Sequence, residues 1–208
     1  MLKLSLPISL QSLLEVTAFS FSAILVGWMG KYELAAHQVA HSLSSLSYML
    51  ATGIGAAATI RVSHQYGSGN YKGMYMAGKA SIHMSVFLMS ICAMIFLLFK
   101  NQLPWLYTND AGVIPIASKL IIVLAFFQIF DATQLASMSS LRGLKDINRP
   151  LLYSAISYYG ICLPCACLFG FVLKLGPVGV WIGLLLGLFT ASVLFYIRFN
   201  RQCRKYLV

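Results

Sequence analysis

Long apolar stretches separated by short polar connectors run through the whole chain. A helix that crosses the hydrocarbon core of a bilayer needs about 20 mostly apolar residues. The segments that meet this length are 4–28, 35–60, 77–99, 113–139, 151–173 and 177–199. The alternation over roughly ten residues that is typical of membrane β-barrel strands is absent from the sequence. The pattern therefore predicts an all-α membrane protein, a bundle of about six transmembrane helices spanning residues 1–208.

The composition supports a membrane protein and excludes a soluble one. The chain is 59% hydrophobic and 10% charged, with a mean hydropathy of +0.80, whereas soluble domains carry about 25% charged residues. Its net charge of +10 does not indicate nucleic-acid binding, because the basic residues fall between apolar runs rather than in a basic module. We expect membrane lipid, and no nucleic acid, as a partner.

The basic residues divide unequally between the two sets of connectors. One set holds four of the fifteen Lys and Arg residues: Lys31, Lys100, Lys119 and Lys174. The other set, with the start of the chain and a basic tail at 200–208, holds the remaining eleven. Because the more basic side of a membrane protein faces the cytoplasm, we expect a multi-pass protein of the plasma (inner) membrane with both termini cytoplasmic.

Two acidic residues, Glu15 and Asp131, sit inside apolar stretches of a chain with only five acids. A carboxylate at membrane depth costs at least about 2.5–3.5 kcal/mol on insertion scales. The sequence offers no basic residue deep in a predicted helix near either acid. Each carboxylate must then be protonated or meet a cation from outside, which predicts a functional site at both residues.

The fourth predicted helix groups Asp131 with residues that suit a flat organic ligand. Phe127, Gln134 and Met138 share its face, and Gln128 lies at the edge of that face. Aromatic and methionine side chains adapt to apolar ligands, and an unpaired acid attracts a positive charge. The alternative is a carboxylate that a neighbouring helix satisfies.

The second predicted helix carries a narrow polar stripe, which we interpret as a hydrogen-bonded interior or a cavity lining. Its members are His37, His41, Ser44, Tyr48, Thr52 and Gly55. The two histidines have no third ligand nearby, and Cys162, Cys165 and Cys167 have no fourth, so we expect packing rather than a metal site. Neither an HExxH helix nor another catalytic signature is present, so no enzyme is expected.

Several motifs along the chain resemble the C-terminal half of the multidrug and toxic compound extrusion (MATE) transporters. They are LPISLQ at 6–11 with Glu15 after it, GWMG at 27–30, LAAHQ at 34–38, GIGAAATIRVS at 53–63, GSG at 67–69, LYTND at 106–110, QIFDATQ at 128–134 and LRGLKD at 141–146. The resemblance covers nearly the whole chain. It implies one lobe of a twelve-helix transporter that exchanges Na⁺ or H⁺ for hydrophobic organic cations, with no cofactor beyond the coupling ion.

The resemblance also implies roles for particular residues. Glu15 and Asp131 match the acids that couple cation or proton movement, and they would hold Na⁺ if Na⁺ is the coupling ion. Phe127 stands where some members have a tyrosine, so no hydroxyl is available there. The residues expected in the substrate cavity are Phe19, Tyr48, Phe127, Gln128, Gln134 and Met138.

About six helices make only half of such a transporter, so we expect a second, N-terminal six-helix lobe from the same gene or a partner chain. The chain would then be a fragment, a truncated gene product or a half-transporter, with a homodimer of half-transporters ranking lower. Two other functions stay open: a flippase for lipid-linked oligosaccharides, which would favour a basic cavity, and a non-transporting membrane scaffold subunit.

Overall fold

The computed structural model describes residues 2–207 and the side chains of residues 5–207, and the described chain is mostly helical. The helices are α1 (Leu2–Gly27), α2 (Lys31–Gly67), α3 (Tyr71–Leu98), the short 3₁₀ turn η1 (Leu103–Leu106), α4 (Ile114–Gly143), α5 (Asn148–Ala155), the π-helical segment η2 (Ile156–Cys162), α6 (Leu163–Cys167), the π-helical segment η3 (Leu168–Val172) and α7 (Gly176–Leu207). The segments α5, η2, α6 and η3 follow one another without a break. The described residues therefore form six helices long and apolar enough to cross a membrane, as predicted.

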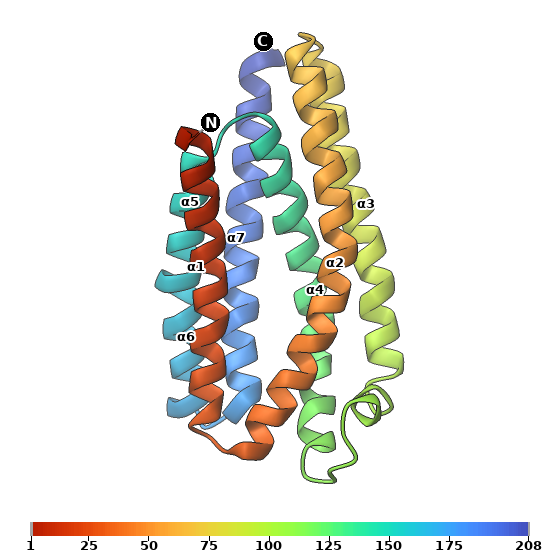
Figure 1. The fold of residues 1–208 in the computed structure, drawn as a ribbon, viewed down its shortest axis with the longest axis vertical. Coiled ribbons are helices and arrows are strands. Elements are labelled where there is room, and N and C mark those ends of the chain that lie inside the picture. Colours follow the sequence, from red (N-terminus) through yellow and green to blue (C-terminus); the bar gives the residue numbers. More distant parts are fainter. Residues whose placement is uncertain (1, 208) are drawn as a thin grey trace.

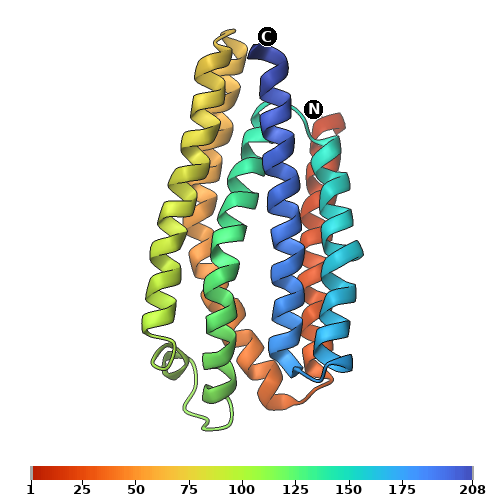
Figure 2. The same cartoon turned by 180° about the vertical axis from the view of Figure 1, so that it is seen from behind.

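The six long helices stand side by side, and the two ends of the chain lie at the same end of the bundle (Figure 1). The α2–α3 and α4–α5 connections lie at that end too, and the remaining connections lie at the other (Figure 2). The central helix α4 packs against α2, α3 and α7. This arrangement collects the basic connectors at the end that holds the termini; which side of the membrane that end faces stays a prediction.

Two helices run well past their predicted ends. The second was expected to stop at residue 60 and continues to Gly67, where Val62 and Tyr66 pack into the core beside α4 and α7. The last continues to Leu207, so residues 200–207 of the predicted tail are helical. Arg204 and Lys205 in its final turn favour this continuation, because cations stabilise the negative end of a helix dipole. Met1 and Val208 lie outside the described residues.

The fifth membrane-spanning helix widens into π-helix just before Pro164. Proline has no backbone N–H, so the Gly160 carbonyl four residues earlier loses its α-helical donor. Wider turns in the preceding segment η2 accommodate this loss. The altered turn contains Tyr158, whose side chain is buried.

A row of glycines lets α7 lie against the fifth helix at backbone contact. Gly179, Gly183 and Gly187 are four residues apart and face Phe169, Ala166 and Cys162 respectively. Small residues at this spacing allow close helix packing in membranes, where dispersion contacts replace the hydrophobic effect. Cys162 thus serves as a small packing residue in this contact.

Adding one methyl group at Gly183 is expected to destabilise the protein. An alanine Cβ there would collide with the backbone of Ala166, and overpacking costs about 1–3 kcal/mol. The matched control is Gly53→Ala on α2, whose Cβ would meet nothing within 4 Å and which should be stabilising by about 0.5–1 kcal/mol. Thermal unfolding in detergent should move in opposite directions for the two variants; shifts of the same sign would refute this packing.

Candidate functional site

A cavity of about 420 Å³ opens between α1, α2 and α4. It draws five residues from α1, six from α2 and two from α4, which are Glu15, Val16, Phe19, Ser20, Ala23, His37, Gln38, His41, Ser44, Ser45, Tyr48, Phe127 and Asp131. Pockets that hold drug-sized ligands have volumes of about 300–1,000 Å³. The cavity is therefore large enough for an organic molecule of that size.

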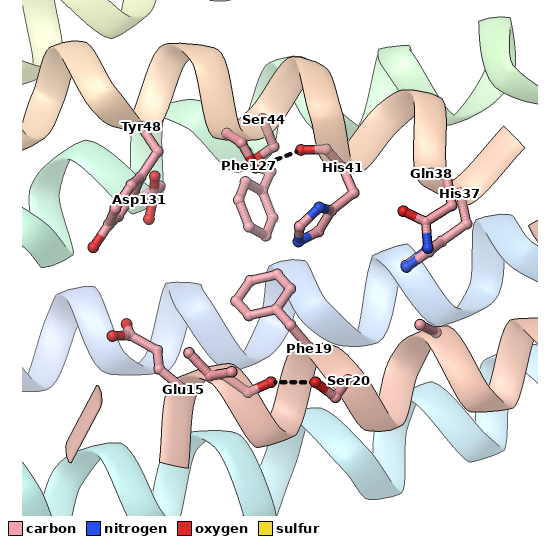
Figure 3. Close-up of a pocket in the computed structure, with 13 residues that line it drawn as sticks. Glu15, Phe19, Ser20, His37, Gln38, His41, Ser44, Tyr48, Phe127 and Asp131 are labelled. Carbon is pink, nitrogen blue, oxygen red and sulfur yellow. Dashed lines mark hydrogen bonds between the residues drawn. The ribbon is translucent and has the colours of Figure 1, made fainter. Parts of the chain in front are cut away.

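The chemistry of the cavity changes along its length (Figure 3). Glu15, Tyr48 and Asp131 lie toward one end, and His37 and Gln38 lie toward the other. Among the residues that line it, the two acids are the only formal charges, and no Lys or Arg is present. One end is therefore acidic and the other carries uncharged hydrogen-bonding groups.

Five aromatic rings form a closed circuit beside the cavity. Phe19 contacts His41 and Phe127 with ring centroids 6.0 and 6.1 Å apart. Trp181 continues the circuit to Phe127 and to His37, at 5.7 Å in each case. His37 and His41 close it by stacking at 6.2 Å. Three of these five contacts are edge-to-face, an arrangement that aromatic pairs prefer, so the wall between the two ends is preorganised.

His37 has a defined hydrogen-bonding state within this circuit. The Trp181 indole Nε1 donates to His37 Nδ1 at 3.1 Å, and the His37 side chain is buried. Since an indole nitrogen can only donate, Nδ1 must be the acceptor, and a neutral His37 carries its proton on Nε2. The histidine stripe predicted on the second helix thus contributes His37, His41, Ser44 and Tyr48 to the cavity lining.

Glu15 is held from behind by two donors. The Tyr158 hydroxyl and Gln134 Nε2 each donate to Glu15 Oε1 at 2.6 Å, and Gln134 Nε2 also donates to the Tyr158 hydroxyl at 2.7 Å. No described residue hydrogen-bonds Glu15 Oε2. One oxygen of this cavity-lining carboxylate is therefore anchored, and the other has no hydrogen-bond partner among the described residues.

Asp131 has no such support. Its side chain is 7% exposed and lines the cavity from α4, yet no other residue in the described part of the chain hydrogen-bonds it or forms an ion pair with it. The charges of Asp131 and Glu15 act on one another electrostatically. Two like charges with one unpaired member form a site that a cation or a proton would stabilise.

Arg142 is a positive charge that the sequence analysis placed in a connector. Because α4 continues to Gly143, Arg142 lies inside the bundle, where Nη2 donates to Gln11 Oε1 at 3.3 Å and contacts Met138 Sδ at 3.5 Å. Its charge acts on Glu15, although the two form no ion pair within 4.0 Å. The expectation that neither acid has a basic neighbour is therefore wrong for Glu15.

Three of the residues predicted for the cavity do not line it. Gln128 is fully buried and donates to Ser47 Oγ at 2.6 Å, behind the cavity wall. Gln134 lies behind Glu15, and Met138 accepts a contact from Gln11 Nε2 at 3.0 Å. The remaining predicted residues, Phe19, Tyr48 and Phe127, line the cavity together with both acids.

Tyr158 is the residue near the acids that sequence reasoning missed. It precedes Tyr159 in an apolar helix, and the sequence does not show which of the two adjacent tyrosines faces the interior. In the structure Tyr158 is 1% exposed, while Tyr159 is 37% exposed and its hydroxyl lies 2.5 Å from Thr17 Oγ1. Pro164 was the available signal, because it marks where the helical period changes.

Comparison with known proteins places the whole chain in one family of transporters. The family model described as MatE matches residues 7–168. The chain is 38% identical to the probable multidrug resistance protein NorM of Xanthomonas campestris pv. campestris over 205 residues, which cover 99% of this chain and 45% of that protein. It is 37% identical to the protein of the same name from Rhizobium meliloti, with coverage of 97% and 44%. The chain thus spans about half the length of the curated relatives it matches.

Solved structures share the fold over nearly the entire chain. The crystal structure of the eukaryotic MATE transporter AtDTX14 matches with a TM-score of 0.90 and 26% identity, covering 98% of this chain and 47% of that one. A crystal structure of MATE in the bent conformation also has a TM-score of 0.90, at 20% identity, and shows the fold alone. Since the family model covers well over half of the sequence, the chain belongs to the MatE family, and it is a multi-pass membrane protein and not an enzyme.

Proposed function

We propose that this chain is one lobe of a cation-coupled multidrug efflux antiporter that exports hydrophobic organic cations. The observation that carries the proposal is the cavity itself, where aromatic walls lead to an unpaired Asp131 beside a half-anchored Glu15. An organic cation gains from both parts, because its flat apolar body packs against Phe19 and Phe127 and its charge meets the acids. The NorM relatives are named as probable multidrug resistance proteins, which supports the multidrug part of this proposal.

The coupling ion, Na⁺ or H⁺, would act at the same two acids. If an ion or proton occupies Asp131 and Glu15, their attraction for an organic cation is lost, and a bound organic cation excludes the ion in turn. Reciprocal weakening of this kind is a coupling free energy between two ligands. Exchange of one for the other across the membrane then follows when the lobe alternates its access to the two sides.

A second six-helix lobe is expected to complete the cavity. The chain matches less than half the length of the NorM proteins and of the MATE structures. In transporters built from repeats, the substrate site lies at the interface between them. We propose that the open side of the cavity between α1, α2 and α4 faces that second lobe, which comes from the same gene or from a partner chain.

A flippase for lipid-linked oligosaccharides fits this cavity less well. Phosphate groups are held by Arg and Lys side chains, and the lining offers two acids and no basic residue. A scaffold subunit that uses Glu15 and Asp131 only to pair with other helices would leave no role for an unpaired acid in a cavity of this size.

Transport driven by an imposed ion gradient tests the proposal. Everted membrane vesicles that contain the transporter with this lobe should accumulate ethidium when a Na⁺ or a proton gradient is imposed, and collapse of the effective gradient should stop accumulation. The gradient that works identifies the coupling ion. Ethidium movement at the same rate with and without either gradient would refute coupling. Copurification of a stable partner protein without any ethidium movement would favour the scaffold function.

A further inference from the structure

A second, basic groove lies between α3 and α7, away from the cavity of α1, α2 and α4. It has a volume of about 350 Å³ and is lined by residues near the start of α3 and the end of α7. Both of these helix ends lie at the end of the bundle that holds the termini (Figure 2). Lys79 and Tyr75 line it from α3, and Arg201, Arg204 and Asn200 line it from α7. The groove contains no acidic residue among its lining, so its character is opposite to that of the transport cavity.

Close packing of α3 against α7 holds the two walls of the groove together. Gly78 has no side chain, which lets the Phe199 ring press against α3, and the Tyr75 ring stacks on Phe199 at 6.3 Å with 14° between the planes. The Tyr75 hydroxyl then donates to Asn200 Oδ1 at 3.3 Å. Lys79 Nζ lies 4.9 Å from the centroid of the Tyr75 ring. The lysine is thus oriented by a fixed aromatic ring that tertiary contacts hold in place.

The three cations of the groove are not neutralised by the described part of the protein. Neither Lys79 nor the two arginines form an ion pair with an acidic residue there. Asp146 forms an ion pair with a different residue, Arg198, whose Nε lies 2.7 Å from Asp146 Oδ2. Three positive charges from two helices therefore converge on one hollow without a counter-ion, and an anion would stabilise them.

The position of the groove along the helices indicates where that anion comes from. Residues 80–98 of α3 and 176–197 of α7 contain no Asp, Glu, Lys or Arg. Each stretch is about long enough to cross the hydrocarbon core, which takes roughly 20 residues. Lys79 and Arg201 thus lie just beyond the apolar stretches, at the level of lipid headgroups. Tyr75 and Tyr196 fit the aromatic belt found at this level.

We propose that this groove binds the headgroup phosphate of an anionic phospholipid, whose acyl chains lie along the apolar surface of α3 and α7. Basic pockets between transmembrane helices are suited to such headgroups. Arg201 and Arg204 supply guanidinium donors for phosphate oxygens, and Lys79 supplies a third positive charge. Ile197 lines the groove, and Val193 lies one turn before it on α7; both are exposed and offer apolar contact for a chain. The site is independent of the proposed transport function.

Binding of defined lipids to the purified full-length chain tests the site. Native mass spectrometry with added phosphatidylglycerol or phosphatidylcholine should show preferential retention of phosphatidylglycerol. The variant with Lys79→Gln, Arg201→Gln and Arg204→Gln should bind it more weakly by on the order of 100-fold, from about fivefold per basic residue. Arg201→Gln alone should give a partial loss. Circular dichroism should show unchanged helix content, since these side chains lie at the surface.

The matched control removes the same charge from the same end of the bundle but outside the groove. Lys72→Gln, Arg149→Gln and Lys205→Gln together change exposed side chains that do not line it, so this variant should keep the wild-type preference. An equal loss in both triple variants, or no preference for phosphatidylglycerol in the unmodified protein, would overturn the site. Displacement of the lipid by inorganic phosphate as readily as by short-chain phosphatidylglycerol would overturn its assignment to a lipid.

Discussion

Asp131→Asn is expected to abolish ion-driven export of organic cations while the protein still folds. The side chain makes no hydrogen bond or ion pair with the rest of the described chain, so an amide of the same shape breaks no contact. It removes the charge that both ligands need. Loss of one partner of a desolvated charge pair costs about 2–5 kcal/mol, which corresponds to a fall in ethidium affinity of at least about 30-fold.

The control for this variant is Asp110→Asn. Asp110 is exposed in the connection before α4, where its Oδ1 accepts a hydrogen bond from the Gly112 backbone at 2.8 Å. An asparagine oxygen can accept the same bond, so export should be unaffected. Ethidium efflux from cells and membrane expression should be measured for both variants. Export by Asp131→Asn at the unmodified rate would remove Asp131 from the mechanism.

Glu15→Gln is expected to have an effect of similar size for a different structural reason. Glu15 Oε1 accepts from both Tyr158 and Gln134, and a glutamine oxygen in the same place can accept from both. The variant therefore keeps the geometry of this end of the cavity and loses only the charge. Ion-coupled export should disappear with no loss of thermal stability.

Tyr158→Phe separates the charge of Glu15 from its position. The variant keeps the carboxylate but removes one of the two donors that anchor it, so export should fall less than in Glu15→Gln. Because Tyr158 is argued to act through Glu15, the double variant should export no worse than Glu15→Gln alone. Ethidium efflux should be measured for the unmodified protein, the two single variants and the double variant. Losses that add independently in the double variant would show that Tyr158 does not act through Glu15.

The sequence predicts the helical bundle and draws attention to two of its acids because both follow from one strong physical constraint. Hydrocarbon thickness requires apolar runs of fixed length, so the helices could be located from the pattern alone. The same hydrocarbon makes Glu15 and Asp131 costly, so they stand out without knowledge of their neighbours.

The neighbours themselves depend on tertiary packing, which periodicity does not reveal. On α4, Asp131, Gln134 and Met138 fall on one broad face, but only Asp131 meets the cavity; Gln134 meets Glu15 and Met138 meets Gln11. Tyr158 lies in the π-helical segment η2 before Pro164, where the helical period changes, so an α-helical pattern read from the sequence does not place its side chain. Arg142 was missed for a related reason. The apolar run predicted the end of the fourth helix at residue 139, but α4 stays helical and packed in the bundle as far as Gly143.

Equilibrium binding of ethidium to the purified transporter in the presence of Na⁺ or at varied pH tests the central claim most directly. If the organic cation and the coupling ion share Glu15 and Asp131, ethidium affinity should fall as one of these ions increases. In Asp131→Asn the affinity should be low and should not respond to that ion. An affinity that responds to neither Na⁺ nor protons, and that Asp131→Asn leaves unchanged, would contradict the assignment of this cavity to coupled exchange.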